Sequence, residues 1–176
     1  IEVPLQAPNT LRFRILLTLV LAAAFALSAR AIEVGNVAPA FTLKSTRGNV
    51  DSAALKGKIV YVDFWASWCV PCKQSFPWMN EMQAKHGERG LEVVAINVDA
   101  KQVDADKFLA QIPAKFQVAF DAAGDTPKKF GVKAMPSAVI VGADGRVLHV
   151  HAGFRDGDKA ALEAAIVAAL DGLKKR

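Results

Sequence analysis

The pattern of apolar residues predicts alternating strands and helices from residue 59 onward. Residues 59–65 and 91–98 are nearly continuous apolar runs with the length and β-branched content of strands that are covered on both faces. Between them, the pattern over residues 71–85 predicts a helix. Further elements are predicted at residues 103–112 (a helix), 116–120 (a strand) and 126–130 (a helical turn). The alternation indicates a parallel βαβ crossover.

Hairpins are predicted on both sides of this βαβ region. Residues 35–51 are rich in turn-forming residues and hold only short apolar pieces, which is typical of a hairpin. Residues 137–141 and 147–152 have the pattern of two strands, and the Asp-Gly pair at 144–145 predicts a tight turn between them. An amphipathic helix is predicted over residues 158–170.

Together these elements predict one α/β domain with a mixed central sheet flanked by helices. Of the 176 residues, 52% are hydrophobic and 22% are charged, which is typical of a globular protein and excludes disordered, collagen-like and coiled-coil chains. Internal repeats, linkers and low-complexity segments are absent from the sequence after residue 31. We therefore expect a single domain over residues 32–176.

The segment before residue 32 has the features of an export signal. Residues 15–27 are uncharged and largely apolar, Arg12 and Arg14 precede them, and Ala29-Arg30-Ala31 has small residues at the positions that a signal peptidase reads. The alternative is an uncleaved membrane anchor, but this run is shorter than the roughly 20 residues that span a bilayer as a helix. We expect residues 1–31 to be a cleaved signal peptide with an undefined start, and the domain to be periplasmic or otherwise extracytoplasmic.

The charge of the chain is moderate and dispersed. The net charge is +5, and the longest basic run is Lys174-Lys175-Arg176. Because the predicted signal contains three arginines and one glutamate, the remaining chain carries +3. We therefore expect no nucleic-acid partner, and we expect a monomer.

The two cysteines, Cys69 and Cys72, form a single C-x-x-C motif. Two cysteines are too few for a disulfide-dense scaffold or a four-cysteine zinc site. The motif lies between the predicted strand 59–65 and the predicted helix 71–85, which places Cys69 at the helix N-terminus and Cys72 about one turn inside. Because the positive end of a helix dipole favours a thiolate, we expect Cys69 to be the nucleophile and Cys72 the resolving thiol.

The sequence around this motif resembles the thioredoxin superfamily. The matching residues are Val62-Asp63-Phe64-Trp65-Ala66, Trp68-Cys69, Pro71-Cys72-Lys73, Pro77, Gly131-Val132 and Met135-Pro136. The resemblance covers residues 34–170 and implies a thioredoxin-like thiol-disulfide oxidoreductase with a redox-active Cys69-Cys72 disulfide and no other cofactor or metal. An N-terminal hairpin, the predicted signal, and an extra helix and strand between residues 97 and 136 are similar to the TlpA/ResA-type extracytoplasmic oxidoreductases.

Asp63 is a single carboxylate in an otherwise apolar strand. We expect it to be buried, because the residues around it in the sequence are apolar; the alternative is an exposed position at a strand edge. Burial disfavours the charged form and raises the pKa of a carboxyl group, which suits a general base for the Cys72 thiol. The resemblance implies the same role for Asp63, and it places Ala95 where thioredoxins often carry a lysine.

The resemblance also implies a substrate-binding loop that faces the cysteines. In the family, the position of Met135-Pro136 is a cis-proline loop; the alternative is an ordinary trans proline that opens the strand 137–141. Backbone groups of such a loop can pair with an extended substrate segment. Trp68 is implied as a further substrate contact.

The residues between the cysteines favour a reductase of protein disulfides. Val70 and Pro71 carry no charge that would stabilise a thiolate and thereby make the disulfide a strong oxidant. In an oxidising compartment, such a reductase needs a membrane-borne thiol reductant as electron donor. A disulfide-donating oxidase and a Cu(I)-binding module on the same two thiolates are the alternatives. Ser75 stands where cytochrome-maturation relatives often carry a glutamate, which argues against a dedicated apocytochrome reductase.

The three histidines have no predicted role in the chemistry. His149 and His151 alternate along a predicted strand, so they share one face, and we expect a solvent-facing pair. We expect His86, near the end of its helix, to interact favourably with the helix dipole.

Overall fold

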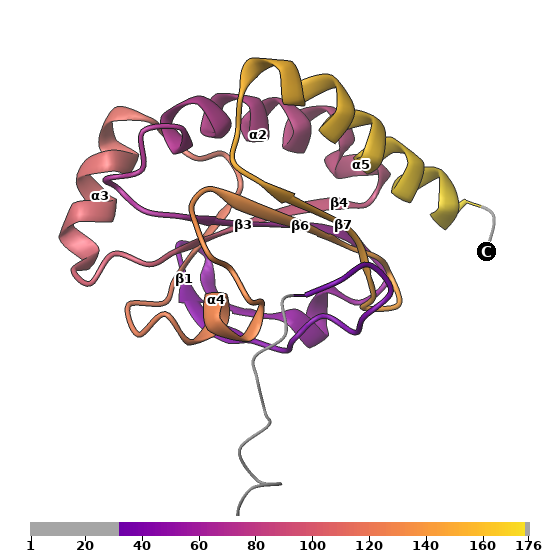
Figure 1. Ribbon diagram of the computed structural model, residues 1–176, viewed down its shortest axis with the longest axis horizontal. Coiled ribbons are helices and arrows are strands. Elements are labelled where there is room, and N and C mark those ends of the chain that lie inside the picture. The colour runs from indigo at the N-terminus through magenta and orange to yellow at the C-terminus, as the bar shows by residue number, and fades with distance from the viewer. Residues whose placement is uncertain (1–31, 175–176) are drawn as a thin grey trace, which may run out of the picture. The chain divides into compact units, whose positions relative to one another are not determined.

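The computed structural model describes residues 32–174, and the predicted signal peptide lies outside these described residues. The centre of the described domain is a mixed sheet with the strand order β2-β1-β5-β4-β3-β6-β7 (Figure 1). The strands are β1 (Thr42–Ser45), β2 (Gly48–Asp51), β3 (Ile59–Trp65), β4 (Leu91–Asn97), β5 (Gln117–Phe120), β6 (Ser137–Val141) and β7 (Val147–Ala152). The predicted fold class, a thioredoxin-like α/β domain with a mixed sheet, is confirmed.

Helices cover both faces of the sheet, unequally. They are α2 (Cys72–His86), α3 (Gln102–Gln111), α4 (Asp125–Lys129) and α5 (Lys159–Leu173), with short 3-10 turns η1 (Ser52–Leu55), η2 (Gly87–Arg89) and η3 (Asp156–Asp158). Figure 1 shows α2, α3 and α5 on one face and α4 on the other. Over the described residues, no helix is long and apolar enough to cross a membrane.

The three central strands β3, β4 and β5 are parallel, while β6 runs antiparallel to β3. The carboxyl ends of β3, β4 and β5 therefore meet at one edge of the sheet, together with the start of β6. Ligands and reactive groups of open α/β sheets gather at this edge, because the loops that leave the strands converge there.

Alternate residues of β3 point to opposite faces of the sheet. Tyr61 and Trp65 belong to the buried cluster beneath α2, whereas Val62 and Phe64 belong to the cluster on the opposite face. The α2 cluster is rich in aromatic contacts, with ring centroids 4.7 Å apart for Trp65–Phe76, 4.9 Å for Phe76–Phe108 and 5.3 Å for Phe76–Phe116. By the same alternation, Asp63 faces α2.

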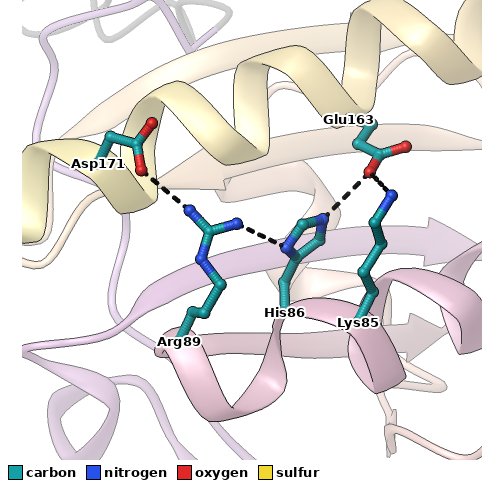
Figure 2. Close-up of polar contacts among 5 residues, drawn as sticks. All are labelled: Lys85, His86, Arg89, Glu163 and Asp171. Atoms are coloured by element: carbon teal, nitrogen blue, oxygen red, sulfur yellow. Dashed lines mark hydrogen bonds and ion pairs between the residues drawn. The ribbon is translucent and has the colours of Figure 1, made fainter.

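The C-terminal end of α2 is joined to α5 by the polar cluster in Figure 2. Arg89 Nη1 lies 3.1 Å from His86 Nδ1, and His86 Nε2 lies 3.2 Å from Glu163 Oε1. Because an arginine can only donate, His86 Nδ1 accepts, and the ring proton on Nε2 is donated to Glu163. Arg89 also contacts Asp171 at 2.9 Å, and Lys85 pairs with Glu163. His86 is thus buried and hydrogen-bonded at both ring nitrogens, beyond the dipole interaction that we predicted.

Candidate active site

Cys69 and Cys72 form a disulfide at the edge of the sheet where β3 leads into α2. Their Cα atoms lie 5.3 Å apart. The two side chains are almost covered, with 3% of Cys69 and none of Cys72 exposed. The neighbouring apolar side chains Trp68 and Val70 are 69% and 68% exposed. The disulfide therefore lies just below the surface, inside an apolar rim.

The start of α2 differs from the prediction, because the helix begins at Cys72 and Cys69 precedes it by three residues. The Cys69 N–H donates to the Ala66 carbonyl at 3.1 Å, and the Cys72 N–H donates to the Cys69 carbonyl at 3.2 Å. Two consecutive turns thus lead into the helix, and Pro71, with a φ of −65°, is its N-cap residue. Cys72 is the first helical residue, not one turn inside. Cys69 still lies at the positive end of the helix dipole.

Asp63 lies in a buried, apolar part of β3, as expected. Only 1% of the residue is exposed, and its neighbours across the sheet are Ala95 on β4 and Ala138 on β6. Within the described region, Asp63 Oδ2 has no hydrogen-bond partner. Burial raises the pKa of Asp63 well above the usual aspartate value. The carboxyl group therefore holds a proton more tightly than an exposed aspartate.

The loop before β6 reaches the same edge of the sheet as the disulfide. The Met135–Pro136 peptide bond is cis. Ser137 pairs with Phe64 near the end of β3, which places Met135 and Pro136 beyond that end. The Pro136 carbonyl accepts a hydrogen bond from the Gly153 N–H at 2.8 Å, whereas the backbone of Met135 makes no hydrogen bond to any described residue.

A hydrogen-bonded group beside the disulfide loop was missed by the sequence analysis. Asp99, which follows β4 and is 6% exposed, accepts hydrogen bonds from the backbone N–H and the hydroxyl of Ser67, both at 2.9 Å. Asn97 Nδ2 donates to the same carboxylate at 2.8 Å. The available signal was the appearance of polar residues at the carboxyl end of an apolar strand, which is where functional groups of α/β sheets gather.

The histidine pair on β7 is half-buried, not solvent-facing as predicted. His149 and His151 pair with Ile140 and Ala138 on the face that α2 and α5 cover, so part of each ring is shielded. The rings stack with centroids 6.3 Å apart, and burial, followed by the nearby His151, lowers the pKa of His149. Residues 32–174 contain no group of three or more His, Cys, Asp or Glu side chains that could hold a metal ion.

These features define the class of the protein. A C-x-x-C disulfide between a central strand and the following helix, on a thioredoxin-like mixed sheet, is the site of a thiol-disulfide oxidoreductase. The Redoxin family matches residues 33–166, and the chain belongs to this family. Within the thioredoxin superfamily it is a ResA/TlpA-like protein, as the sequence predicted.

Individual relatives support the same assignment. Thiol-disulfide oxidoreductase ResA of Bacillus cereus (strain ATCC 10987 / NRS 248) is 32% identical over 149 residues, 80% of this chain and 86% of the relative. A structure assigned as the thiol:disulfide interchange protein DsbE from Chlorobium tepidum matches with a TM-score of 0.78 and 54% identity, covering 80% of this chain and 99% of that one. A secreted Mycobacterium tuberculosis disulfide oxidoreductase, with a TM-score of 0.63, 24% identity and coverage of 73% and 95%, supports the fold.

Proposed function

We propose that this oxidoreductase is an extracytoplasmic, periplasmic-type reductase of protein disulfides. Cys69 is the nucleophile, Cys72 the resolving thiol and Asp63 the proton acceptor. The observation that carries the proposal is a nearly covered disulfide above a buried carboxylate. That carboxylate, Asp63 of β3, faces α2, and its neighbours across the sheet are two alanines and not a cation. No soluble cofactor is required, because the electron pair is carried by the two sulfurs.

The first half of the reaction is attack by the reduced protein on its substrate. The Cys69 thiolate attacks one sulfur of the substrate disulfide, so that a bond forms between Cys69 Sγ and that sulfur. The second substrate sulfur leaves as a thiolate and takes up a proton from water. The product is a mixed disulfide between the protein and its substrate.

The second half is resolution by Cys72. Asp63 accepts the proton of the Cys72 thiol, and the resulting thiolate attacks Cys69 Sγ, which releases the remaining substrate sulfur as a thiolate. The protein becomes a disulfide and loses two electrons, and the substrate gains them. The position of Asp63 supports this role, because it faces α2 between two alanines of the buried cluster that also contains Cys72. Its raised pKa brings its proton affinity closer to that of a thiol.

The exposed rim supports protein disulfides as the substrate. Trp68 and Val70 present apolar surface on either side of Cys69, and aromatic side chains are common anchors in protein interfaces. The unpaired backbone of Met135 lies beyond the end of β3, where an extended substrate segment can add to it as a short strand. Pro136, which is buried, holds this loop in place through the Gly153 hydrogen bond.

The charges around the disulfide support the reductive direction. Val70 and Pro71 lack charge, and the nearby carboxylate is that of Asp63, on the face of β3 that α2 covers. A carboxylate disfavours a nearby thiolate, and a less stabilised reduced form makes a stronger reductant. An extracytoplasmic reductant of this kind is recharged by a membrane-borne thiol donor.

The function is tested by trapping. In Cys72→Ser the mixed disulfide cannot be resolved, so incubation of the reduced variant with extracytoplasmic proteins should give covalent adducts through Cys69 that a reductant releases. Cys69→Ser is the matched control and should give none. Adducts that form equally in both variants would contradict the assignment of the nucleophile.

The direction is tested by equilibration with graded dithiothreitol and glutathione buffers, reading the disulfide by mass. A midpoint near those of reducing dithiols is expected. A strongly oxidising midpoint, with fast disulfide transfer to a reduced unfolded protein, would instead make the protein an oxidase. Stoichiometric Cu(I) retention without disulfide reduction would make it a copper-binding module.

A further inference from the structure

A carboxylate on one loop holds the loop that carries the nucleophile. Ser67 donates its backbone N–H to Asp99 Oδ2 and its hydroxyl to Asp99 Oδ1, both at 2.9 Å. The two residues are 32 positions apart in the sequence. The contact therefore joins the β3–α2 connection to the β4–α3 connection.

Asp99 is itself fixed to the end of the parallel sheet. Its own N–H donates to Asn97 Oδ1 at 3.0 Å, and Asn97 Nδ2 donates to Asp99 Oδ2 at 2.8 Å. Asn97 pairs with Trp65 at the end of β4 and β3, and the Val98 N–H donates to the Trp65 carbonyl at 3.0 Å. The carboxylate is thus held by a rigid part of the fold, and its hydrogen bonds are directed at Ser67.

Ser67 lies within the turn that leads to Cys69. The turn runs from Ala66 to Cys69 and is closed by the 3.1 Å hydrogen bond from the Cys69 N–H to the Ala66 carbonyl, so Ser67 is its second residue. The N-cap residue Pro71 makes no side-chain cap to α2. In the described part of the chain, Asp99 is the only residue whose side chain hydrogen-bonds to the segment 66–71.

We propose that Asp99 is a positioning residue that orients the Ala66–Cys69 turn so that Cys69 Sγ lies in line with the substrate disulfide. Thiol-disulfide exchange needs the attacking sulfur in line with the bond that breaks, and small displacements from such a geometry are costly in rate. This proposal requires that Cys69 is the nucleophile, as in the proposed function, and it does not depend on the direction of electron flow.

Three substitutions separate the hydrogen bonds from the charge. Asp99→Asn keeps the shape: its amide oxygen can replace Oδ2 as acceptor for Ser67 N–H and Asn97, and its amide nitrogen can donate to the Ser67 hydroxyl. Asp99→Ala removes both the hydrogen bonds and the charge. Ser67→Ala removes only the hydroxyl contact and leaves the backbone N–H bound to Asp99.

Two rates are measured on each reduced full-length variant. One is the single-turnover rate of exchange with a protein disulfide, which needs in-line geometry, and the other is alkylation of Cys69 by iodoacetamide across a pH series, which reports the thiolate and its access. For Asp99→Ala we expect exchange to slow at least about tenfold, with the alkylation profile within about twofold of wild type. Asp99→Asn should stay within about threefold of wild type in both rates. The exchange rate of Ser67→Ala should lie between those of wild type and Asp99→Ala.

The outcomes that overturn the proposal are distinct. If Asp99→Asn is as slow in exchange as Asp99→Ala, the charge and not the positioning matters. If alkylation falls in parallel with exchange, Asp99 acts on thiolate formation. If Asp99→Ala does not fold, as judged by circular dichroism, an unchanged exchange rate in Ser67→Ala overturns the proposal. Failure of the nucleophile assignment would show separately, as exchange that persists in Cys69→Ser.

Discussion

Replacing Asp63 by asparagine should stabilise the oxidised protein, and the effect should grow as the pH rises from acidic values. Burial beside Ala95 and Ala138 raises the pKa of Asp63 in the folded state, while the unfolded chain keeps a value near 3.9. The folded state thus binds the Asp63 proton more tightly than the unfolded state does. Stability is therefore highest below the unfolded pKa, falls as the pH rises toward the folded pKa, and then levels off.

The size of the effect follows from one proton. Between the two pKa values, folding retains about one proton that the unfolded chain releases, so the free energy of unfolding falls by about 1.4 kcal/mol per pH unit. A urea dependence of about 1–3 kcal/mol per molar converts this slope into a fall of the urea midpoint by about 0.5–1.4 M per pH unit. Asp63→Asn lacks the titrating group, so this component of the slope disappears.

The assay is urea unfolding between pH 4.5 and 7. The oxidised protein is used because disulfide-bonded cysteines do not titrate. Groups other than Asp63 titrate alike in both proteins and cancel in the difference; the pKa of Tyr61, raised by burial and then by Asp63, keeps it outside this window. Asp106→Asn, at an exposed position on α3, is the matched control. A difference in stability between wild type and Asp63→Asn that does not change with pH would show that Asp63 does not retain its proton in the folded state.

The same variant tests the chemistry. Asp63→Asn should slow release of the mixed disulfide near neutral pH, and it should leave the first attack by Cys69 unchanged. Release at the wild-type rate, together with the expected gain in stability, would confirm the burial effect and contradict the proton-acceptor role.

Two further predictions concern the rim and the docking of α5. Trp68→Ala should lower kcat/KM for protein disulfides about tenfold, with little change for oxidised glutathione, because only a protein substrate contacts the exposed ring. Val150→Ala, at an exposed apolar position on β7, is the control. Equal losses on both substrates would contradict the docking of protein substrates on Trp68. Arg89→Ala leaves His86 Nδ1 without its donor and should cost about 1 kcal/mol, or about 3 °C in Tm. Asp171→Asn, which removes only a surface ion pair, should cost less, and a larger loss than in Arg89→Ala would contradict the importance of the His86 contact.

Local patterns in the sequence were sufficient for most of the fold. The strands β3, β6 and β7 have the predicted bounds. Each is a short segment whose pattern of apolar residues is typical of a strand with one or both faces buried. The alignment with thioredoxins also placed Ala95 next to Asp63, and the observed register pairs these two residues. The motif itself identified the redox chemistry, since Cys69 and Cys72 are close in sequence and their spacing permits a disulfide.

Helix boundaries near the site were less predictable. Periodicity does not resolve where a turn becomes a helix, because the turn from Cys69 to Cys72 and the first helical turn differ only in their hydrogen bonds. The prediction therefore placed Cys72 one turn too far into α2. At the other end of the chain, α5 continues to Leu173, three residues beyond the predicted end, where Leu173 packs against the buried cluster beneath α2.

The elements, the class of fold and the redox motif could be predicted from the sequence, because each of these depends on residues that are neighbours along the chain. The contacts that orient the site could not be predicted in this way, because they join residues that are far apart along the chain. Asp99 meets Ser67 across 32 residues, and His86 meets Glu163 across 77. Neither pair leaves a periodic signal, since such partners are brought together by the parallel crossover of β3 and β4 and by the packing of α5 on α2.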